Sequence, residues 1–235
     1  MIGIIGAMAT EVDELVAALA HPTRKTLLGV TFHEGSLAGE EVVVACAGVG
    51  KVNAALTAGA MLLTYCPSLL LNTGVAGALD RTLRQGDVVL ASSLVQYDMD
   101  TTPLGEPRGL LNIRGEERVE IPTDPAALAA LTRACSSLGI TPRSGLIATG
   151  DCFVASREQK ANILADFPAL ACEMEGAAIA HAAYAAGVPC AVLRVISDGA
   201  DEQAKLDFPT FARQTAKRSQ KILPAFLEEY RRGTK

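Results

Sequence analysis

Apolar runs alternate with stretches of helical periodicity along most of this chain. Short apolar runs bounded by glycine, proline or acidic residues are typical of buried strands, and longer stretches with apolar residues three and four positions apart are typical of amphipathic helices. We therefore expect strands over residues 2–6, 30–37, 41–47, 69–72, 87–95, 143–149, 169–173 and 190–196. We expect helices over residues 11–19, 51–65, 125–138, 157–165, 175–186 and 209–231. Thr10 is predicted to cap the first of these helices.

Buried strands that alternate with helices predict an α/β fold with three αβα layers around a central, twisted, mixed and mostly parallel sheet. The strands 30–37 and 41–47 read as a hairpin, which argues against a purely doubly wound sheet. No repeat or linker divides the 235 residues, so we expect a single domain over 1–235. Residues 99–123 are rich in glycine, proline and charge, and we expect an irregular segment that forms a flap over the site or part of a subunit contact.

Residues 52–79 contain no charged side chain, and their number would suffice to span a bilayer. Two asparagines and Pro67 interrupt the stretch, and the sequence around Pro67 is typical of a helix end followed by a loop. The stretch therefore predicts an Ala-rich helix and a central strand instead of a membrane span.

Composition and charge exclude several classes of partner. The net charge is −5 and aromatic residues make up 4% of the chain without any Trp, which argues against a nucleic-acid surface. The six cysteines form no CxxC pair and the three histidines are not at ligand spacing, so we expect neither disulfides nor a metal site. The N-terminus lacks the basic region of a signal peptide. We expect a cytoplasmic protein with free thiols, no membrane contact and no cofactor.

Acidic side chains follow several predicted strands. Glu11 follows the first strand, Glu173 and Glu175 end the strand at 169–173, and Asp198 ends the next one, which also contains Arg194. A buried carboxylate is costly unless it has a partner or a function. The carboxyl ends of parallel strands share one edge of the sheet, where open α/β sheets bind ligands. We therefore predict an active site built from acids.

Other motifs narrow the reaction. No GxSxG elbow occurs and no Ser or Cys has an evident His base, so acyl transfer is poorly supported. The segment GVGKVNAA at 48–55 is similar to a dinucleotide-binding turn, but Asn53 replaces its third glycine, and no Walker A motif is present. Acid-driven chemistry remains, in which one carboxyl protonates a leaving group and another activates water, as in the cleavage of a glycosidic bond. A third acid would suit the hydroxyls of a ribose.

Each acid also has a purely structural interpretation. Glu11, and one of Glu173 and Glu175, could be helix-start acids favoured by the helix dipole. Asp198 could serve only to form a turn. Arg194 is harder to explain in this way, because an apolar strand rarely buries arginine without an anionic partner.

Six segments, in their order along the chain, resemble one family. They are GIIGAMATEV at 3–12, AGVGKVNAA at 47–55, NTGVAGAL at 72–79, TGDCF at 149–153, EMEGAAIAH at 173–181 and RVISDGAD at 194–201. They resemble the bacterial 5′-methylthioadenosine/S-adenosylhomocysteine nucleosidases of the purine nucleoside phosphorylase/uridine phosphorylase superfamily. The match covers nearly the whole chain.

The resemblance implies a nucleoside phosphorylase-like fold and hydrolysis of the N-glycosidic bond of 5′-methylthioadenosine, S-adenosylhomocysteine and 5′-deoxyadenosine. Asp198 would protonate N7 of adenine, Glu11 would activate water with Arg194 nearby, and Glu175 would hold the ribose hydroxyls. The residues implied to contact substrate are Met8, Val49, Val75, Phe153, Val154, Glu173, Met174, Ser197 and Phe208. Of these, Glu173 is better suited to a structural role. The resemblance also implies a homodimer in which a loop with Thr101 and Leu104 closes the neighbour's pocket.

Two positions depart from the family pattern, and alternatives remain open. Val75 stands where relatives often have Ser, and Leu104 where many have an aromatic residue, which leaves the preferred 5′ substituent undetermined. An acid at position 11 and the absence of an Arg after strand 69–72 favour water over phosphate as nucleophile. The main alternative is a futalosine or aminofutalosine hydrolase. A phosphate-dependent phosphorylase or a nucleoside-binding module without catalysis is less favoured.

Overall fold

The structure, a computed structural model, describes residues 1–233, and residues 234–235 of the expected domain lie outside the described part. The strands are β1 (Ile2–Gly6), β2 (Ala20–Leu27), β3 (Val30–Leu37), β4 (Glu40–Cys46), β5 (Leu69–Ala78), β6 (Val88–Gln96), β7 (Leu111–Ile113), β8 (Glu116–Arg118), β9 (Glu120–Pro122), β10 (Arg143–Thr149), β11 (Ala171–Glu173) and β12 (Cys190–Asp198). The helices are α1 (Ala9–Ala17), α2 (Lys51–Tyr65), α3 (Pro125–Ser137), α4 (Arg157–Asp166), α5 (Gly176–Ala186) and α6 (Ala204–Gly233), with a short 3-10 turn, η1 (Thr102–Leu104).

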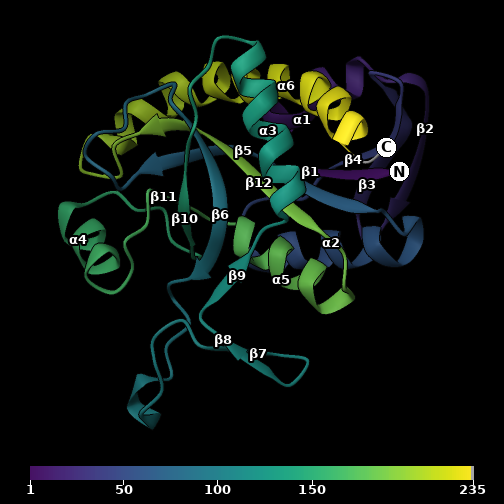
Figure 1. Cartoon of the computed structure of the whole chain (residues 1–235). Helices are drawn as coiled ribbons and strands as arrows, with labels where there is room; N and C mark the ends of the chain where they lie inside the picture. The colour runs from purple at the N-terminus through teal and green to yellow at the C-terminus, as the bar shows by residue number, and fades with distance from the viewer. Residues whose placement is uncertain (234–235) are drawn as a thin grey trace.

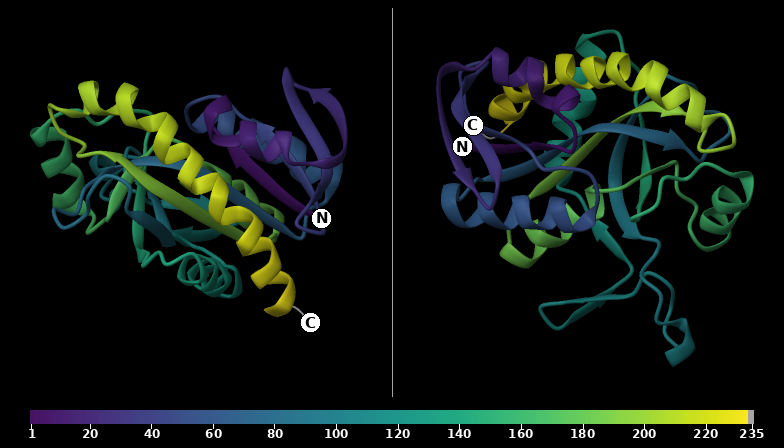
Figure 2. Two further views of the ribbon diagram at one scale, coloured as in Figure 1. Left: turned by 90° about the horizontal axis from the view of Figure 1, so that it is seen from above. Right: turned by 180° about the vertical axis from the view of Figure 1, so that it is seen from behind.

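Helices cover both faces of the central sheet (Figure 1). On one face α6 packs against α1 and α3, and on the other α2 packs against α5. Seen from above and from behind, α6 crosses its whole layer, and the two ends of the chain lie on the same side of the molecule (Figure 2). The expected three-layer α/β fold with a mixed, mostly parallel central sheet is confirmed.

The strand order brings the acid-ended strands together. The sheet runs β11-β10-β6-β12-β5-β1-β4-β3-β2, and β11 pairs additionally with β5, so that one part of the sheet closes on itself. Gly77 of β5 is the register partner of Cys172 on one side and of Asp198 on the other. β1 is parallel to β5, so its C-terminal end reaches the same edge. This edge therefore collects residues from β1, β5, β11 and β12.

The central strands are apolar on both faces because each face is covered by helices. Ile4 of β1 lies in a buried cluster with side chains of α1, α3 and α6. The next residue, Ile5, lies in a second cluster with side chains of α2 and α5. Among residues 1–233 no helix is both long and apolar enough to cross a membrane, and the uncharged residues 52–79 belong mainly to α2 and β5.

Three expectations about element boundaries are wrong. The first helix begins after Met8, without a side-chain cap from Thr10, and the Glu11 carboxylate instead accepts from the backbone of the preceding turn. β5 continues to Ala78 instead of ending at residue 72, since its small residues pair with β12. α6 begins at Ala204 instead of residue 209 and continues through Pro209 and Pro224, each of which leaves one backbone hydrogen bond of the helix unmade.

The strands in two parts of the chain, β2 and residues 99–123, were not predicted from the sequence. β2 is almost entirely exposed and pairs with β3 as an edge strand, so no apolar alternation marks it. Residues 99–123 were expected to be irregular, but they include η1, the hairpin β7–β8 and β9, which pairs with β6. Much of this segment projects from the body of the molecule (Figure 1).

Candidate active site

A cavity of about 340 Å³ lies at the sheet edge where the acid-ended strands meet. It is lined by Ala7, Met8, Glu11, Val49, Val75, Ala76, Gly77, Cys152, Phe153, Val154, Cys172, Glu173, Met174, Glu175, Ser197, Asp198 and Phe208. Twelve of these seventeen residues are acids or substrate contacts that the sequence predicted. Of the predicted site residues, Arg194, Thr101 and Leu104 do not line the cavity. The motifs therefore converge in space although they are spread over 200 residues.

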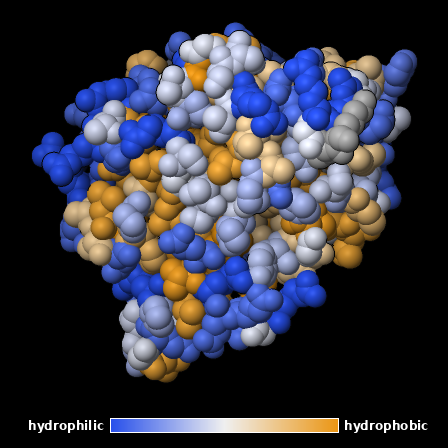
Figure 3. Space-filling view, viewed as in Figure 1, coloured by the Kyte–Doolittle hydropathy of each residue, from blue (hydrophilic) through white to orange (hydrophobic). Residues whose placement is uncertain are grey.

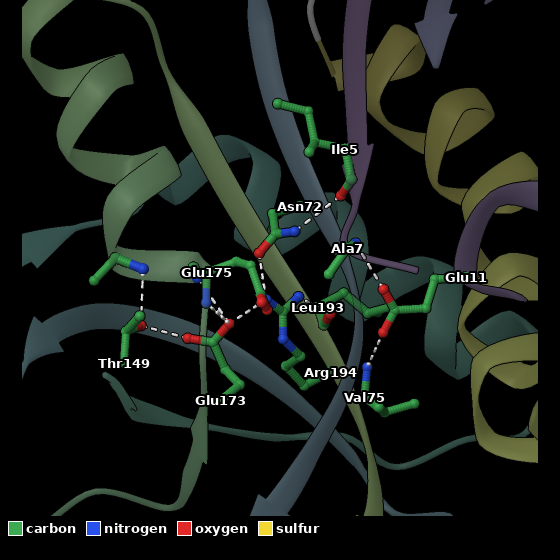
Figure 4. Close-up of polar contacts among 12 residues, drawn as sticks. Ile5, Ala7, Glu11, Asn72, Val75, Thr149, Glu173, Glu175, Leu193 and Arg194 are labelled. Atoms are coloured by element: carbon green, nitrogen blue, oxygen red, sulfur yellow. Dashed lines mark hydrogen bonds and ion pairs between the residues drawn. The ribbon is translucent and has the colours of Figure 1, made fainter. Parts of the chain in front are cut away.

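The Glu11 carboxylate is held by backbone donors from the turn after β1 and from β5. Its Oε2 accepts from Ala7 N at 2.7 Å and Met8 N at 3.0 Å, and its Oε1 accepts from Val75 N at 3.1 Å (Figure 4). Gly74 permits this approach, because a Cβ there would lie 2.5 Å from Oε1. Burial raises the pKa of Glu11, although Arg194 and the backbone donors act in the opposite direction. The group is fixed in place and holds a proton more readily than an exposed glutamate.

Glu175 lies at the start of α5 and faces the glycine turn before α2. Its Oε1 accepts from Gly50 N at 2.7 Å. Burial, together with the neighbouring Glu173 carboxylate, raises the pKa of Glu175 to about 7. Near neutral pH the side chain can therefore accept hydrogen bonds as the carboxylate or donate one as the acid, and a ligand with paired hydroxyls can bind to either form.

Glu173 anchors a buried network behind the cavity. Its Oε2 accepts from Glu175 N at 3.0 Å and Gly176 N at 2.7 Å, and its Oε1 accepts from the Thr149 hydroxyl. It also forms an ion pair with Arg194, in which both side chains are 2% exposed (Figure 4). These contacts satisfy the first N–H groups of α5 and thereby fix the backbone that carries Glu175.

Arg194 was expected to lie near Glu11, and its charge does act on that carboxyl, but its side chain does not line the cavity. Its guanidinium donates to Glu173 and to Asn72 Oδ1, while Asn72 Nδ2 donates to Ile5 O at 2.8 Å. Burial alone would lower the pKa of Arg194, but the surrounding carboxylates raise it, so the charge persists. The anionic partner that a buried arginine requires is Glu173. Arg194 lies behind the cavity and affects Glu11 through its charge.

Asp198 lies across the cavity at the end of β12. Ser197 Oγ donates to its Oδ2 at 2.8 Å, and Ala200 N donates to its Oδ1 at 2.9 Å. Burial raises the pKa of Asp198, with Asp207 and Asp201 acting in the same direction against these two donors. A carboxyl group with a raised pKa can act as a proton donor closer to neutral pH.

Apolar side chains form the remaining walls. Phe153 and Phe208 meet edge to face with ring centroids 5.3 Å apart, and Phe153 is 42% exposed at the cavity. An exposed aromatic face beside acids offers a stacking surface for a planar heterocycle.

Several residues of the site have no counterpart among the sequence-based candidates. Cys152 and Cys172 line the cavity, while Asn72 and Thr149 support it from behind. Asn72 ends an apolar run, which could have marked it as the partner of a buried charge. Leu104 is 78% exposed on the projecting segment, away from the cavity of its own chain. Among residues 1–233 no group of three His, Cys, Asp or Glu side chains is arranged to hold a metal ion.

Comparison with known proteins places this site in a family. Residues 1–228 match the family model of the phosphorylase superfamily. The 5′-methylthioadenosine/S-adenosylhomocysteine nucleosidase of Shewanella halifaxensis is 36% identical over 97% of this chain and 99% of that protein. The aminodeoxyfutalosine nucleosidase of Helicobacter pylori is 36% identical over 97% of this chain and 98% of that protein.

A solved structure shows the same fold. The S-adenosylhomocysteine nucleosidase of Streptococcus pyogenes, in complex with 5-methylthiotubericidin, superposes with a TM-score of 0.92 at 38% identity. The match covers 97% of this chain and 95% of that one. Given these matches and an acid-lined cavity that gathers the family's motifs, the chain belongs to the phosphorylase superfamily and, within it, to the 5′-methylthioadenosine/S-adenosylhomocysteine nucleosidases.

Proposed function

We propose that this protein hydrolyses the N-glycosidic bond of 5′-methylthioadenosine and S-adenosylhomocysteine, and also of 5′-deoxyadenosine, to release adenine and the 5-substituted ribose. The observation that carries the proposal is the set of three buried acids with raised pKa values, Glu11, Glu175 and Asp198, around one cavity. The names of the relatives support the same substrates.

The three acids divide the work of the reaction. Asp198 donates its proton to N7 of adenine as the glycosidic bond breaks, which the raised pKa of this residue favours. Glu11 orients and deprotonates the attacking water. It does so through the lone pairs of its carboxylate oxygens that do not accept from Ala7 N and Val75 N. Glu175 binds the ribose hydroxyls. An oxocarbenium-like transition state is stabilised by this concentration of carboxylates.

The other lining residues select the substrate. Phe153 stacks on adenine and the backbone of Val154 contacts its edge, while Met174 and Ser197 lie beside the ribose and the general acid. Val75 and Glu173 complete the wall near the sugar. Met8, Val49 and Phe208 form an apolar region suited to a 5′-alkylthio group.

Water should be the nucleophile. The residues that line the cavity include four acids and no Lys or Arg, so a phosphate dianion would meet repulsion without a compensating cation. We expect adenine release from 5′-methylthioadenosine to proceed at full rate in phosphate-free buffer and to be unchanged by added phosphate. Adenine is measured by chromatography, with and without phosphate. A strict requirement for phosphate would identify a phosphorylase instead.

An aminofutalosine hydrolase is the second candidate, because the aminodeoxyfutalosine nucleosidase of Helicobacter pylori is 36% identical to this chain, as is the Shewanella halifaxensis enzyme. The same assay distinguishes the two when it includes S-adenosylhomocysteine, 5′-deoxyadenosine, inosine and aminofutalosine. A kcat/KM for aminofutalosine well above that for 5′-methylthioadenosine would favour this alternative.

The proposal includes a cytoplasmic homodimer that binds no nucleic acid. Val52, Leu56 and Leu63 are more than half exposed at spacings that place them on one face of α2, and Leu104 is exposed on the projecting segment. Hydrophobic patches lie among hydrophilic residues on the face seen in Figure 3. Such apolar surface is typical of a subunit contact. Thr101 and Leu104 would then lie at the partner's cavity.

We expect light scattering to give twice the mass of one chain, and Leu56→Glu to give monomers with reduced activity. Leu138→Glu, at an exposed apolar position near the end of α3, is the matched control and should stay dimeric. A wild-type protein that remains monomeric at micromolar concentration would contradict this part of the proposal.

A further inference from the structure

A lysine outside the cavity joins two strand ends beside Asp198. Lys160 projects from α4, and its Nζ donates to Gly199 O at 2.8 Å and to Ala78 O at 2.6 Å. Gly199 directly follows Asp198 at the end of β12, and Ala78 is the last residue of β5. One ammonium group therefore fixes these strand ends relative to each other.

The turn that carries Asp198 departs from regular backbone geometry. The pairing of β12 with β5 shifts register between Ile196 and Asp198. Ala200 is fully buried with a φ of +50°, in the left-handed region that costs an L-residue about 1–2 kcal/mol. This turn places Ala200 N where it donates to Asp198 Oδ1, and a Cβ at Gly77 would lie within 3.0 Å of both that oxygen and the Ala200 Cβ, which is a tight contact. The direction of the carboxyl group thus depends on a turn that local backbone preference does not favour.

Apart from Lys160, α4 is tied to this region by one apolar residue and one exposed ion pair. Ile163 is the buried residue of α4 and lies in the same apolar cluster as Ala200, but apolar packing does not fix a direction. Arg157 reaches Glu202 through an exposed ion pair of 3.4 Å, and exposed pairs contribute little. The bonds from Lys160 are charge-assisted and reach two carbonyls at short distance, so they are the directional restraint on the strand ends.

We propose that Lys160 is a positioning residue for the reaction: it holds the turn 198–200 so that the Asp198 carboxyl faces the leaving base, without itself touching the substrate. The inference depends on the role proposed above for Asp198. Misplacing a catalytic group by about 1 Å can cost on the order of 10²-fold in rate. Loss of Lys160 should therefore lower kcat and leave KM nearly unchanged.

The first test compares Lys160→Met with Lys160→Arg, using adenine release from 5′-methylthioadenosine. We expect Lys160→Met to lower kcat roughly 10- to 100-fold, with KM within about threefold of wild type, and Lys160→Arg to restore most of kcat. Arg157→Met, which removes a cation from the same helix, is the control and should keep kcat within about twofold. Circular dichroism checks folding. If Lys160→Met does not fold, Lys160→Gln replaces it, and wild-type kcat in that variant would overturn the proposal.

The second test separates positioning from a general structural role. In an Asp198→Asn background, Lys160→Met should cost less than about twofold of the residual rate, because the group that it positions is already inactive. An equal loss in both backgrounds, or wild-type kcat in Lys160→Met, would refute the role of Lys160. Failure of the wild-type protein to release adenine from any nucleoside would instead refute the proposed function itself.

Discussion

Replacing Asp198 by asparagine is expected to lower adenine release from 5′-methylthioadenosine by roughly 10²- to 10⁴-fold, the usual contribution of a general acid. The amide cannot donate the proton that N7 requires when the bond breaks. Its binding interactions in the ground state are nearly those of the acid, so kcat should fall much more than KM rises. Single-turnover and steady-state rates of adenine formation measure the effect.

The fold should survive this substitution, because asparagine can keep both local hydrogen bonds. Its amide oxygen can accept from Ala200 N, and its amide nitrogen can donate to Ser197 Oγ, which also contacts Ala76 O at 3.3 Å. Asp124→Asn is the control, since Asp124 caps α3 outside the cavity lining and an asparagine oxygen can still accept from Ala127 N. Asp198→Asn with activity within about fivefold of wild type would show that another group protonates the base.

Removing the buried cation is expected to have the largest effect on stability. Arg194→Met should lower the free energy of unfolding by about 3–5 kcal/mol, the typical cost of breaking a buried ion pair. Methionine fills similar space, but Glu173 would then lie without its countercharge, close to Glu11 and Glu175, and Asn72 Oδ1 would lose its donor. Urea unfolding followed by circular dichroism at fixed protein concentration gives the value.

Two controls separate burial from charge in this experiment. Arg133→Met breaks an exposed ion pair of 2.9 Å with Glu229 and should cost less than about 1 kcal/mol. Adding Glu173→Gln to Arg194→Met should recover part of the loss, because it removes the isolated carboxylate. A loss below about 1 kcal/mol in Arg194→Met would mean that the network is not important for stability.

The local pattern of apolar and polar residues was sufficient to predict most strands and helices and the acids that follow the strands. β1, α2, β10 and β12 differ from the expected ranges by two residues or fewer at either end, because apolar periodicity reflects which faces are buried. It failed for β5, where the glycines at 74 and 77 suggested a turn. Those glycines instead make room for Glu11 and for the Asp198 turn, a requirement set by distant segments. β2 was missed because an exposed edge strand buries too little to show alternation.

The sequence by itself therefore determined the chemical inventory of this protein: a buried α/β sheet, acids at its strand ends and an arginine that needed an anion. Only the tertiary structure decided how these groups are paired. Pairing of β11 with β5 as well as β10 sets Glu173 against Arg194 in an ion pair, and Glu11, Glu175 and Asp198 line the same cavity as Glu173. The reason is physical. Which buried charges meet depends on the order and register of strands that are distant in sequence, and periodicity along a chain carries no information on either.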